Sequence, residues 1–246
     1  MKGVFIIKLQ PNNFQLETTT IWSFPDRGGW ATHSGNYRGN WSPYVPRNLI
    51  LRYSKPGDWI LDQFIGSGTT LIEAKLLNRN AIGVDINPKS LEISKKNLTF
   101  TYETDSKIYL KQGTAVNLNF FKDDKIDFIC THPPYANIIK YSEKIEGDLS
   151  LLTVEYFLQE MKKVASEAYR VLKKGKMCAI MMGDIRKNRK VIPLGFYVMQ
   201  CFLEVGFTNQ EIIIKQQHHC NSTNYWKNKN RDFLLLAHEY ILIFQK

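Results

Sequence analysis

The chain has 246 residues and a mass of 28.6 kDa, a size that suits one large domain or two small ones. Its hydrophobic content of 43% and mean hydropathy of −0.30 are ordinary for a globular protein with a full core, and no apolar run approaches the length of a membrane span. The net charge of +10 favours an anionic partner, with nucleic acid the first candidate, although many basic proteins bind none.

The N-terminus and the cysteines indicate a cytoplasmic protein. Residues 1–8 contain too short an apolar stretch for a signal peptide and no small-residue cleavage site. The cysteines stand singly, which suits reduced thiols better than a disulfide framework: Cys130, Cys178, Cys201 and Cys220. We therefore expect a cytoplasmic location and no membrane partner.

The elements expected along the chain alternate between strands and helices. Residues 11–48 are rich in Asn, Gly, Trp, Tyr and Pro and predict a loop-rich segment. Beyond it, apolar runs predict strands at 59–61, 81–84, 108–110, 126–130, 177–182, 211–216 and 239–245. Helical spacing predicts helices at 69–78, from Pro88, at 153–172 with a Lys173-Lys174-Gly175 stop, and at 193–204.

Repeated strand–helix units predict an α/β fold, a doubly wound and mostly parallel sheet. The last two strands have no helix between them, so we expect a hairpin that puts one antiparallel strand near the C-terminus. We expect a loop-rich N-terminal segment, residues 1–48, packed on a main domain of residues 49–246. No separate target-recognition domain is evident.

A glycine turn follows the first of these strands, in Asp62-Gln63-Phe64-Ile65-Gly66-Ser67-Gly68-Thr69-Thr70. Its glycines allow a sharp turn and a close approach to a ligand, and the helix N-terminus behind them offers free N–H groups. Asp85 ends the next strand, where a carboxylate can accept hydrogen bonds from ribose hydroxyls. The missing Lys argues against a phosphate-binding loop and the missing third glycine against NAD, although a glycine pair also occurs in plain tight turns.

A rigid turn, His132-Pro133-Pro134-Tyr135, follows the strand at 126–130. Two prolines fix the backbone so that a carbonyl oxygen can accept a hydrogen bond from an amino group. Two acceptors on a base amino group free the nitrogen lone pair, and an aromatic ring such as Tyr135 can stack on a flipped base. The alternative is a plain structural turn with an aromatic residue.

These two motifs resemble those of the amino-methylating DNA methyltransferases, which read Asp-Pro-Phe-x-Gly-Ser-Gly-Thr-Thr and Asp/Asn/Ser-Pro-Pro-Tyr. The resemblance covers about residues 30–246 and includes the stretch from Pro43 to Leu61 and the closing strand 238–244. It implies a Rossmann-like methyltransferase sheet in the main domain, S-adenosylmethionine as methyl donor, and cytosine N4 or adenine N6 as acceptor. It implies a catalytic group of His132, Pro133, Pro134 and Tyr135. The cofactor-binding residues that it implies are Asp62, Phe64, Gly66, Ser67, Gly68, Thr69, Thr70, Asp85, Ile86 and Gly113.

Three positions depart from the family pattern. Gln63 replaces the proline, which should loosen the loop. Thr114 replaces an acidic residue that contacts the adenine of the cofactor. His132 replaces the usual acceptor, and a neutral imidazole still accepts one hydrogen bond through its unprotonated nitrogen. Because Asp is the residue most often seen with adenine, this last departure favours cytosine N4.

Basic residues after the strand at 177–182 lie at the same sheet edge as the motifs and are candidates for phosphate contacts, or else form a solvated loop: Arg186, Lys187, Arg189 and Lys190. Residues 215–232 add Lys227 and Arg231 among aromatic and amide side chains, a mixture that suits nucleic acid but also an ordinary loop. We expect no metal site, because His218, His219 and Cys220 are adjacent and lack a partner motif.

We therefore expect a site-specific DNA amino-methyltransferase acting on a base flipped from duplex DNA. A specificity partner chain or a cognate restriction endonuclease could act with it. Two alternatives stay open: an RNA base-amino methyltransferase with the same chemistry, and an inactive nucleic-acid-binding relative.

Overall fold

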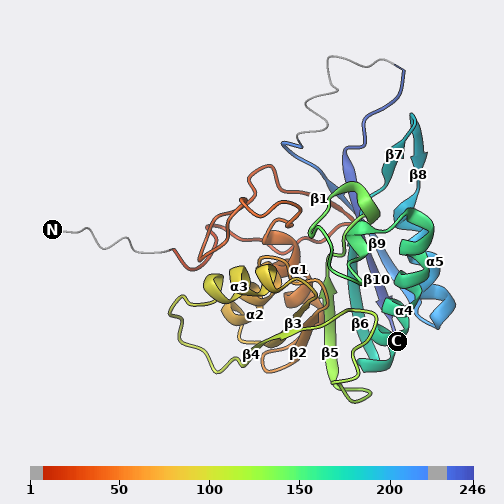
Figure 1. The fold of residues 1–246 in the computed structure, drawn as a ribbon. Helices are drawn as coiled ribbons and strands as arrows, with labels where there is room; N and C mark the ends of the chain where they lie inside the picture. The colour runs from red at the N-terminus through yellow and green to blue at the C-terminus, as the bar shows by residue number, and fades with distance from the viewer. Residues whose placement is uncertain (1–7, 221–231) are drawn as a thin grey trace.

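The computed structural model describes residues 8–220 and 232–246 (Figure 1). Eight strands form one sheet in the order β1-β9-β10-β6-β5-β2-β3-β4. Their bounds are β1 Ile21–Ser23, β2 Trp59–Asp62, β3 Asn80–Asp85, β4 Ile108–Gln112, β5 Ile126–Thr131, β6 Leu172–Met182, β9 Thr208–Gln216 and β10 His238–Gln245. A separate hairpin joins β7, Ile185–Lys187, to β8, Lys190–Ile192.

The α/β fold predicted from the sequence, a mostly parallel doubly wound sheet with an antiparallel strand near the C-terminus, is confirmed. Strands β2, β3, β4, β5 and β6 pair in parallel, whereas β10 pairs antiparallel with both β6 and β9. Because β10 runs the opposite way, its first residues lie at the sheet edge where β2, β3 and β5 end. This placement matters for the site described below.

Helices cover both faces of the sheet (Figure 1). On one side lie α1 Tyr44–Tyr53, α2 Thr69–Leu76 and α3 Pro88–Asn97, and on the other α4 Val154–Val171 and α5 Leu194–Val205. Short 3₁₀ turns occupy Ala136–Ile138 and Leu149–Leu151. None of the helices in the described ranges is long and apolar enough to cross a membrane.

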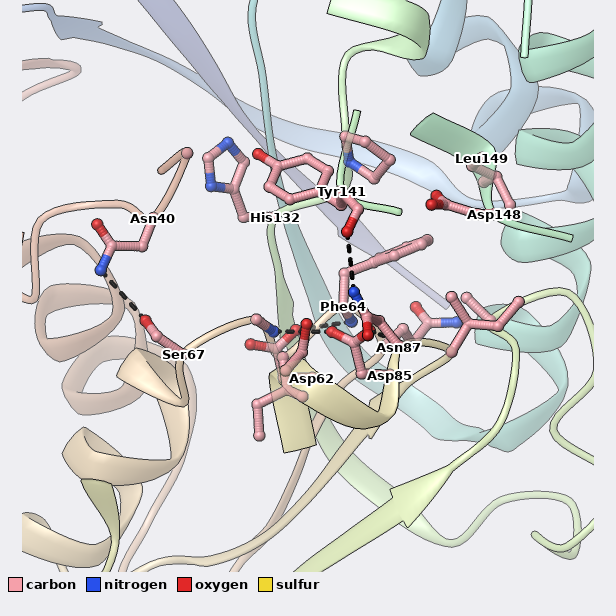
Figure 2. A pocket seen from close by; sticks show the side chains of 18 of the residues that line it. Asn40, Asp62, Phe64, Ser67, Asp85, Asn87, His132, Tyr141, Asp148 and Leu149 are labelled. Carbon is pink, nitrogen blue, oxygen red and sulfur yellow. Dashed lines mark hydrogen bonds between the residues drawn. The ribbon is translucent and has the colours of Figure 1, made fainter. Parts of the chain in front are cut away.

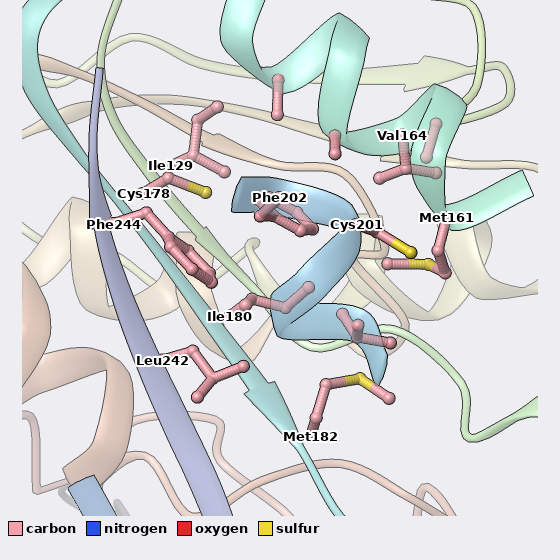
Figure 3. Packing of buried hydrophobic residues seen from close by; sticks show 14 of the residues in the cluster. Ile129, Met161, Val164, Cys178, Ile180, Met182, Cys201, Phe202, Leu242 and Phe244 are labelled. Carbon is pink, nitrogen blue, oxygen red and sulfur yellow. The ribbon is translucent and has the colours of Figure 1, made fainter. Parts of the chain in front are cut away.

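The core has two main parts, one on each face. Helices α4 and α5 pack on the sheet through Met161, Val164, Phe202 and strand residues such as Phe244 (Figure 3). The inward side chains of α4 recur every three or four residues, as expected of an amphipathic helix. On the opposite face, α1 and α2 pack together with Trp22 and Trp41 of the N-terminal segment.

The structure differs from the sequence expectation in several places, among them the β7–β8 hairpin, where no strands are predicted from the sequence. The helix predicted to reach 172 ends at Val171, and Leu172 begins β6 because it pairs with Ile126 on β5 in the buried sheet. Lys173-Lys174-Gly175 therefore belongs to a strand with an irregular register. The N-terminal segment also contributes β1 to the sheet edge, and residue 48 lies inside α1.

Candidate cofactor and substrate site

A cavity with about 770 Å³ of empty space, part of it open to solvent, lies beyond the carboxyl ends of β2, β3 and β5, the usual position for a ligand in a doubly wound sheet (Figure 2). Seven of the residues expected to bind the cofactor line it: Asp62, Phe64, Gly66, Ser67, Thr69, Asp85 and Ile86. Gly68, Thr70 and Gly113 do not line the cavity; Gly68 is the N-cap residue of α2, and the Thr70 hydroxyl donates to Asp62.

The glycine turn is held by its own first residue. Gly66 and Gly68 have φ angles of 51° and 88°, a region that favours glycine. The carboxylate of Asp62 accepts from the Phe64 N–H at 3.0 Å and from the Thr70 hydroxyl at 2.5 Å. It also accepts from Thr131 on β5 at 2.8 Å, so one buried side chain joins the turn to the neighbouring strand.

Asp85 closes the turn from the other side. Its carboxylate accepts from the Gly66 N–H at 3.0 Å and from the Asn87 N–H at 2.8 Å. Burial raises the pKa of both Asp62 and Asp85 to about 6, against the lowering effect of these hydrogen bonds. With Asp148, three carboxyl side chains line the cavity, which therefore suits a ligand that carries positive charge.

The N-terminal segment supplies a wall of the cavity that the motifs did not predict. Tyr37 stacks on Tyr141 with ring centroids 6.2 Å apart, and both rings line the cavity. The Asn40 amide donates to the Ser67 hydroxyl at 3.2 Å and so ties this wall to the glycine turn (Figure 2). These residues come from loops without periodicity, so only the aromatic content of the segment could have suggested them.

Gln63, expected only to loosen the turn, has a more definite environment. Its side chain is 1% exposed and lines the cavity. Neither the oxygen nor the nitrogen of its amide has a hydrogen-bond partner within the described residues. A buried amide without partners is unfavourable, so this side chain is ready to bond to a ligand in the cavity.

His132 forms the opposite end of the cavity. Its Nε2 lies 2.9 Å from the Tyr135 hydroxyl, which donates to Glu239 at 2.8 Å. Trp41 stacks on the imidazole with centroids 5.3 Å apart. Burial lowers the pKa of His132 to about 4, so the ring is neutral at physiological pH, as expected of a hydrogen-bond acceptor.

A larger groove, about 2730 Å³ of open space, begins where the cofactor-sized cavity ends. His132 and Pro134 line both spaces, and Pro133 and Tyr135 line the groove. The catalytic group predicted from the sequence is thus brought to the junction of the two.

The expected phosphate-binding residues lie on the β7–β8 hairpin, which projects beyond the sheet (Figure 1). Arg186 and Arg189 line the groove, whereas Lys187 and Lys190 do not. Arg186 packs over the Phe233 ring at 4.3 Å and donates to the Leu234 carbonyl, and Arg189 pairs with Asp232 at 3.2 Å. Lys227 and Arg231 lie outside the described residues.

Fold and site together define an S-adenosylmethionine-dependent methyltransferase. The cavity has an acidic lining and a glycine turn, both of which suit this cation-bearing cofactor. Across the part of the chain that the structure describes, no group of three or more His, Cys, Asp or Glu side chains could hold a metal ion.

The chain belongs to the DNA methylase family of N6 and N4 methyltransferases, whose model matches residues 6–96 and 126–246. A second model, described as RNA cap guanine-N2 methyltransferase, matches residues 57–182. The cofactor of the protein is S-adenosylmethionine.

Curated relatives include both DNA and tRNA enzymes. A tRNA (guanine(10)-N2)-dimethyltransferase of Methanothermobacter thermautotrophicus is 37% identical over 101 residues, 41% of this chain and 29% of that protein. The type II methyltransferase M.BglI of Bacillus subtilis is 34% identical over 89 residues, 35% of this chain and 26% of its own length. The chain thus spans less than a third of the length of either relative.

Solved structures share the fold at low identity. An S-adenosylmethionine-dependent methyltransferase of Methanosarcina mazei matches with a TM-score of 0.58 and 17% identity, over 80% of this chain and 96% of that one. TrmN of Thermus thermophilus matches with a TM-score of 0.55 and 16% identity, over 86% of this chain and 51% of that one.

Proposed function

We propose that the protein transfers a methyl group to an exocyclic amino nitrogen of a base in DNA, with cytosine N4 favoured over adenine N6. The observation that carries this proposal is that the acidic cavity and the large groove meet at His132 and Pro134. A cofactor in the first and a flipped base in the second would have their reacting atoms at that junction.

The residues of the cavity would hold the cofactor in defined ways. Asp85 would accept from the ribose hydroxyls, and the N–H groups at the start of α2 would meet the carboxylate of the cofactor. The chemistry that S-adenosylmethionine supplies when bound is an activated methyl group. For this cavity we propose the predicted set of Asp62, Phe64, Gly66, Ser67, Thr69, Asp85 and Ile86.

The turn after β5 would prepare the base. A neutral His132 and the carbonyl at Pro133 would accept from the two N–H bonds of the amino group, so that its lone pair becomes available. Tyr135 would pack against the base. The basic residues of the β7–β8 hairpin would contact phosphates of the nucleic acid. Arg186 and Arg189 would do so from the wall of the groove, and Lys187 and Lys190 from outside it.

A second candidate is methylation of guanine N2 in RNA, supported by the similarity to the tRNA enzyme and to the RNA cap family model. The chemistry at the amino nitrogen would be the same, and only the polymer and the base would differ. A third is a relative that binds nucleic acid without transferring the methyl group.

One experiment distinguishes these functions. The purified protein is incubated with labelled S-adenosylmethionine and either unmodified duplex DNA or unmodified transfer RNA, and the digested nucleosides are identified by mass spectrometry. We expect N4-methylcytosine from DNA, and His132→Ala should abolish it while the affinity for the cofactor is kept. N2-methylguanine from RNA would replace the proposal with the second candidate. Cofactor binding without any product would indicate the third.

A further inference from the structure

A chain of hydrogen bonds continues behind His132, away from the cofactor cavity. Tyr135 donates to Oε1 of Glu239 at 2.8 Å, and Oε2 of Glu239 accepts from Lys215 at 2.9 Å. Glu239 is 8% exposed and stands directly opposite Lys215 in the antiparallel pair of β10 and β9. No feature of the two motifs predicts either residue.

The direction of these bonds fixes the state of the imidazole. Burial would raise the pKa of Glu239, but the Lys215 ammonium at 2.9 Å and the hydrogen bond from the Tyr135 hydroxyl lower it, so Glu239 is a carboxylate that only accepts. The single proton of Tyr135 is therefore directed to Glu239. The Tyr135 oxygen must then accept from Nε2–H of the neutral His132, which leaves the lone pair on Nδ1.

We propose that Glu239 is a positioning residue that acts through Tyr135 to keep Nδ1 of His132 unprotonated and to stabilise the imidazolium formed when that nitrogen takes a proton from the target amino group. This inference rests on the proposed function. It gives the presence of His rather than Asn or Ser at position 132 a chemical consequence, because an imidazole is a stronger proton acceptor than an amide or a hydroxyl.

The proton step balances within the site. The methylated amino nitrogen carries four bonds and a positive charge; its N–H bond breaks and the electron pair stays on nitrogen. The proton adds to the lone pair of Nδ1, so that His132 carries protons on both nitrogens. Its positive charge then faces the carboxylate of Glu239 across the Tyr135 hydroxyl, much as a carboxylate stabilises the imidazolium of a catalytic triad.

Other charged groups surround this chain. Lys215 faces Glu239 and opposes a positive charge on His132, whereas Asp184, beyond the end of β6, is a second carboxylate near Tyr135. Trp41 packs against the imidazole and limits its rotation. Glu239 and Lys215 line the groove but not the cofactor cavity, so changes there should leave cofactor binding intact.

Two variants separate the two parts of the proposal. Tyr135→Phe removes the oxygen that accepts from Nε2–H, so ¹⁵N spectra of the histidine-labelled protein at neutral pH should change from one His132 tautomer to a mixture. Glu239→Gln keeps an acceptor for Tyr135 but removes the charge. This variant should keep the His132 tautomer. It should slow single-turnover methyl transfer at least about ten-fold, which is a fraction of the 10²–10⁴-fold that general-base catalysis typically contributes.

The control is Glu211→Gln, the same change at an exposed position of β9, which should alter neither readout. The dissociation constant for S-adenosylmethionine should stay the same in all three variants. A Glu239→Gln protein that transfers methyl groups at the wild-type rate would overturn the proposal, and so would an unchanged His132 spectrum in Tyr135→Phe. If the wild type methylates no nucleic acid, the proposed function and the proton step fall together, and the spectrum alone decides the positioning role.

Discussion

The imidazole of His132 titrates far from the usual range for histidine, and this shift determines the acid limit of the reaction. From the sequence alone, an ordinary pKa near ~6.5 would be expected to switch the acceptor off in mildly acidic solution. Burial instead lowers the pKa to about 4, with Lys215 lowering it further and Glu239 raising it. The acceptor is therefore present throughout the physiological range and is lost only when pH falls through about 4.

We expect the single-turnover rate at saturating cofactor and nucleic acid to be flat on the acid side until pH approaches this value. A pH–rate profile measures the pH at which the rate falls on the acid side, and a ¹⁵N titration of His132 shows whether this residue causes the fall. Protein that has been held at each pH and returned to neutral pH controls for unfolding. A limb centred near pH 6.5 that matches the titration of His132 would contradict the shift.

The unpartnered amide of Gln63 predicts opposite effects on stability and on binding. Gln63→Met removes two buried polar atoms at similar volume, so the free energy of unfolding of the ligand-free protein should rise, by roughly 1 kcal/mol or more. The affinity for S-adenosylmethionine should fall, because the cofactor loses a hydrogen-bonding group in the cavity. Denaturant titration and calorimetry measure the two quantities.

Gln210→Met, an exposed change on β9, is the matched control and should affect both quantities little. If Gln63→Met weakens folding and binding together, the amide has a structural role and the interpretation as a ligand contact is wrong.

At the scale of the elements, the end of β6 must lie close to the turn after β5. Gly183 follows β6, and a Cβ there would lie 2.7 Å from Cε2 of Tyr135. Gly183→Ala should therefore displace the Tyr135 ring, weaken its bonds to His132 and Glu239, and reduce turnover while cofactor affinity is kept. Gly29→Ala, where the added atom meets nothing within 4 Å, is the control. Equal turnover in the two variants would show that the ring can move without consequence.

The sequence predicted best those elements whose signals are local. β5 is buried at every position and its sequence is mostly apolar, interrupted by Asp127, and α4 shows its buried positions at helical spacing. β1 was missed because three residues with one buried side chain carry no readable period. Lys173 to Gly175 was mistaken for a helix end because lysines before a glycine also suit an irregular strand.

In the site, too, the residues predicted from the sequence are those with a local signal, and the residues that were not predicted depend on contacts between distant parts of the chain. The residues of the two motifs adjoin one another in the chain, so their chemistry could be inferred from order and type. Glu239 meets Tyr135 across 104 positions, and Asn40 meets Ser67 across 27. Contacts of this kind depend on the sheet order, in which β10 is inserted antiparallel beside β6, and no spacing rule predicts that order.

At the scale of the whole molecule, one buried carboxylate connects the N-terminal segment to the main domain. Glu73 on α2 is 0% exposed and accepts from the Trp30 indole at 2.7 Å and from Arg47 at 2.8 Å. The Nε2 atom of His33 also lies 2.7 Å from Oε1 of Glu73. Because this site is closed to water, Arg47 and Trp30 would have no replacement hydrogen-bond acceptor if the carboxylate were removed.

Glu73→Gln should lower the free energy of unfolding by about 3–5 kcal/mol, since Arg47 is left as a buried charge without its counterion. Glu160→Gln breaks an exposed pair with Lys163 on α4 and should cost less than about 1 kcal/mol. Denaturant unfolding of both variants measures the difference. Similar costs for the two changes would mean that the buried network contributes no more than a surface pair.

The parallel pairing of β1 with β9 also has a kinetic consequence. Ile21 aligns with Ile214, so this contact joins segments that lie far apart in the chain, and the cavity-wall residues Tyr37 and Asn40 come after β1 in the N-terminal segment. Contacts between distant parts of a chain form slowly, because the connecting loop must first be closed. During refolding, the glycine turn and the central strands should therefore form before the cavity is complete. The ability to bind S-adenosylmethionine should return with the slowest phase, after most of the secondary structure has already appeared.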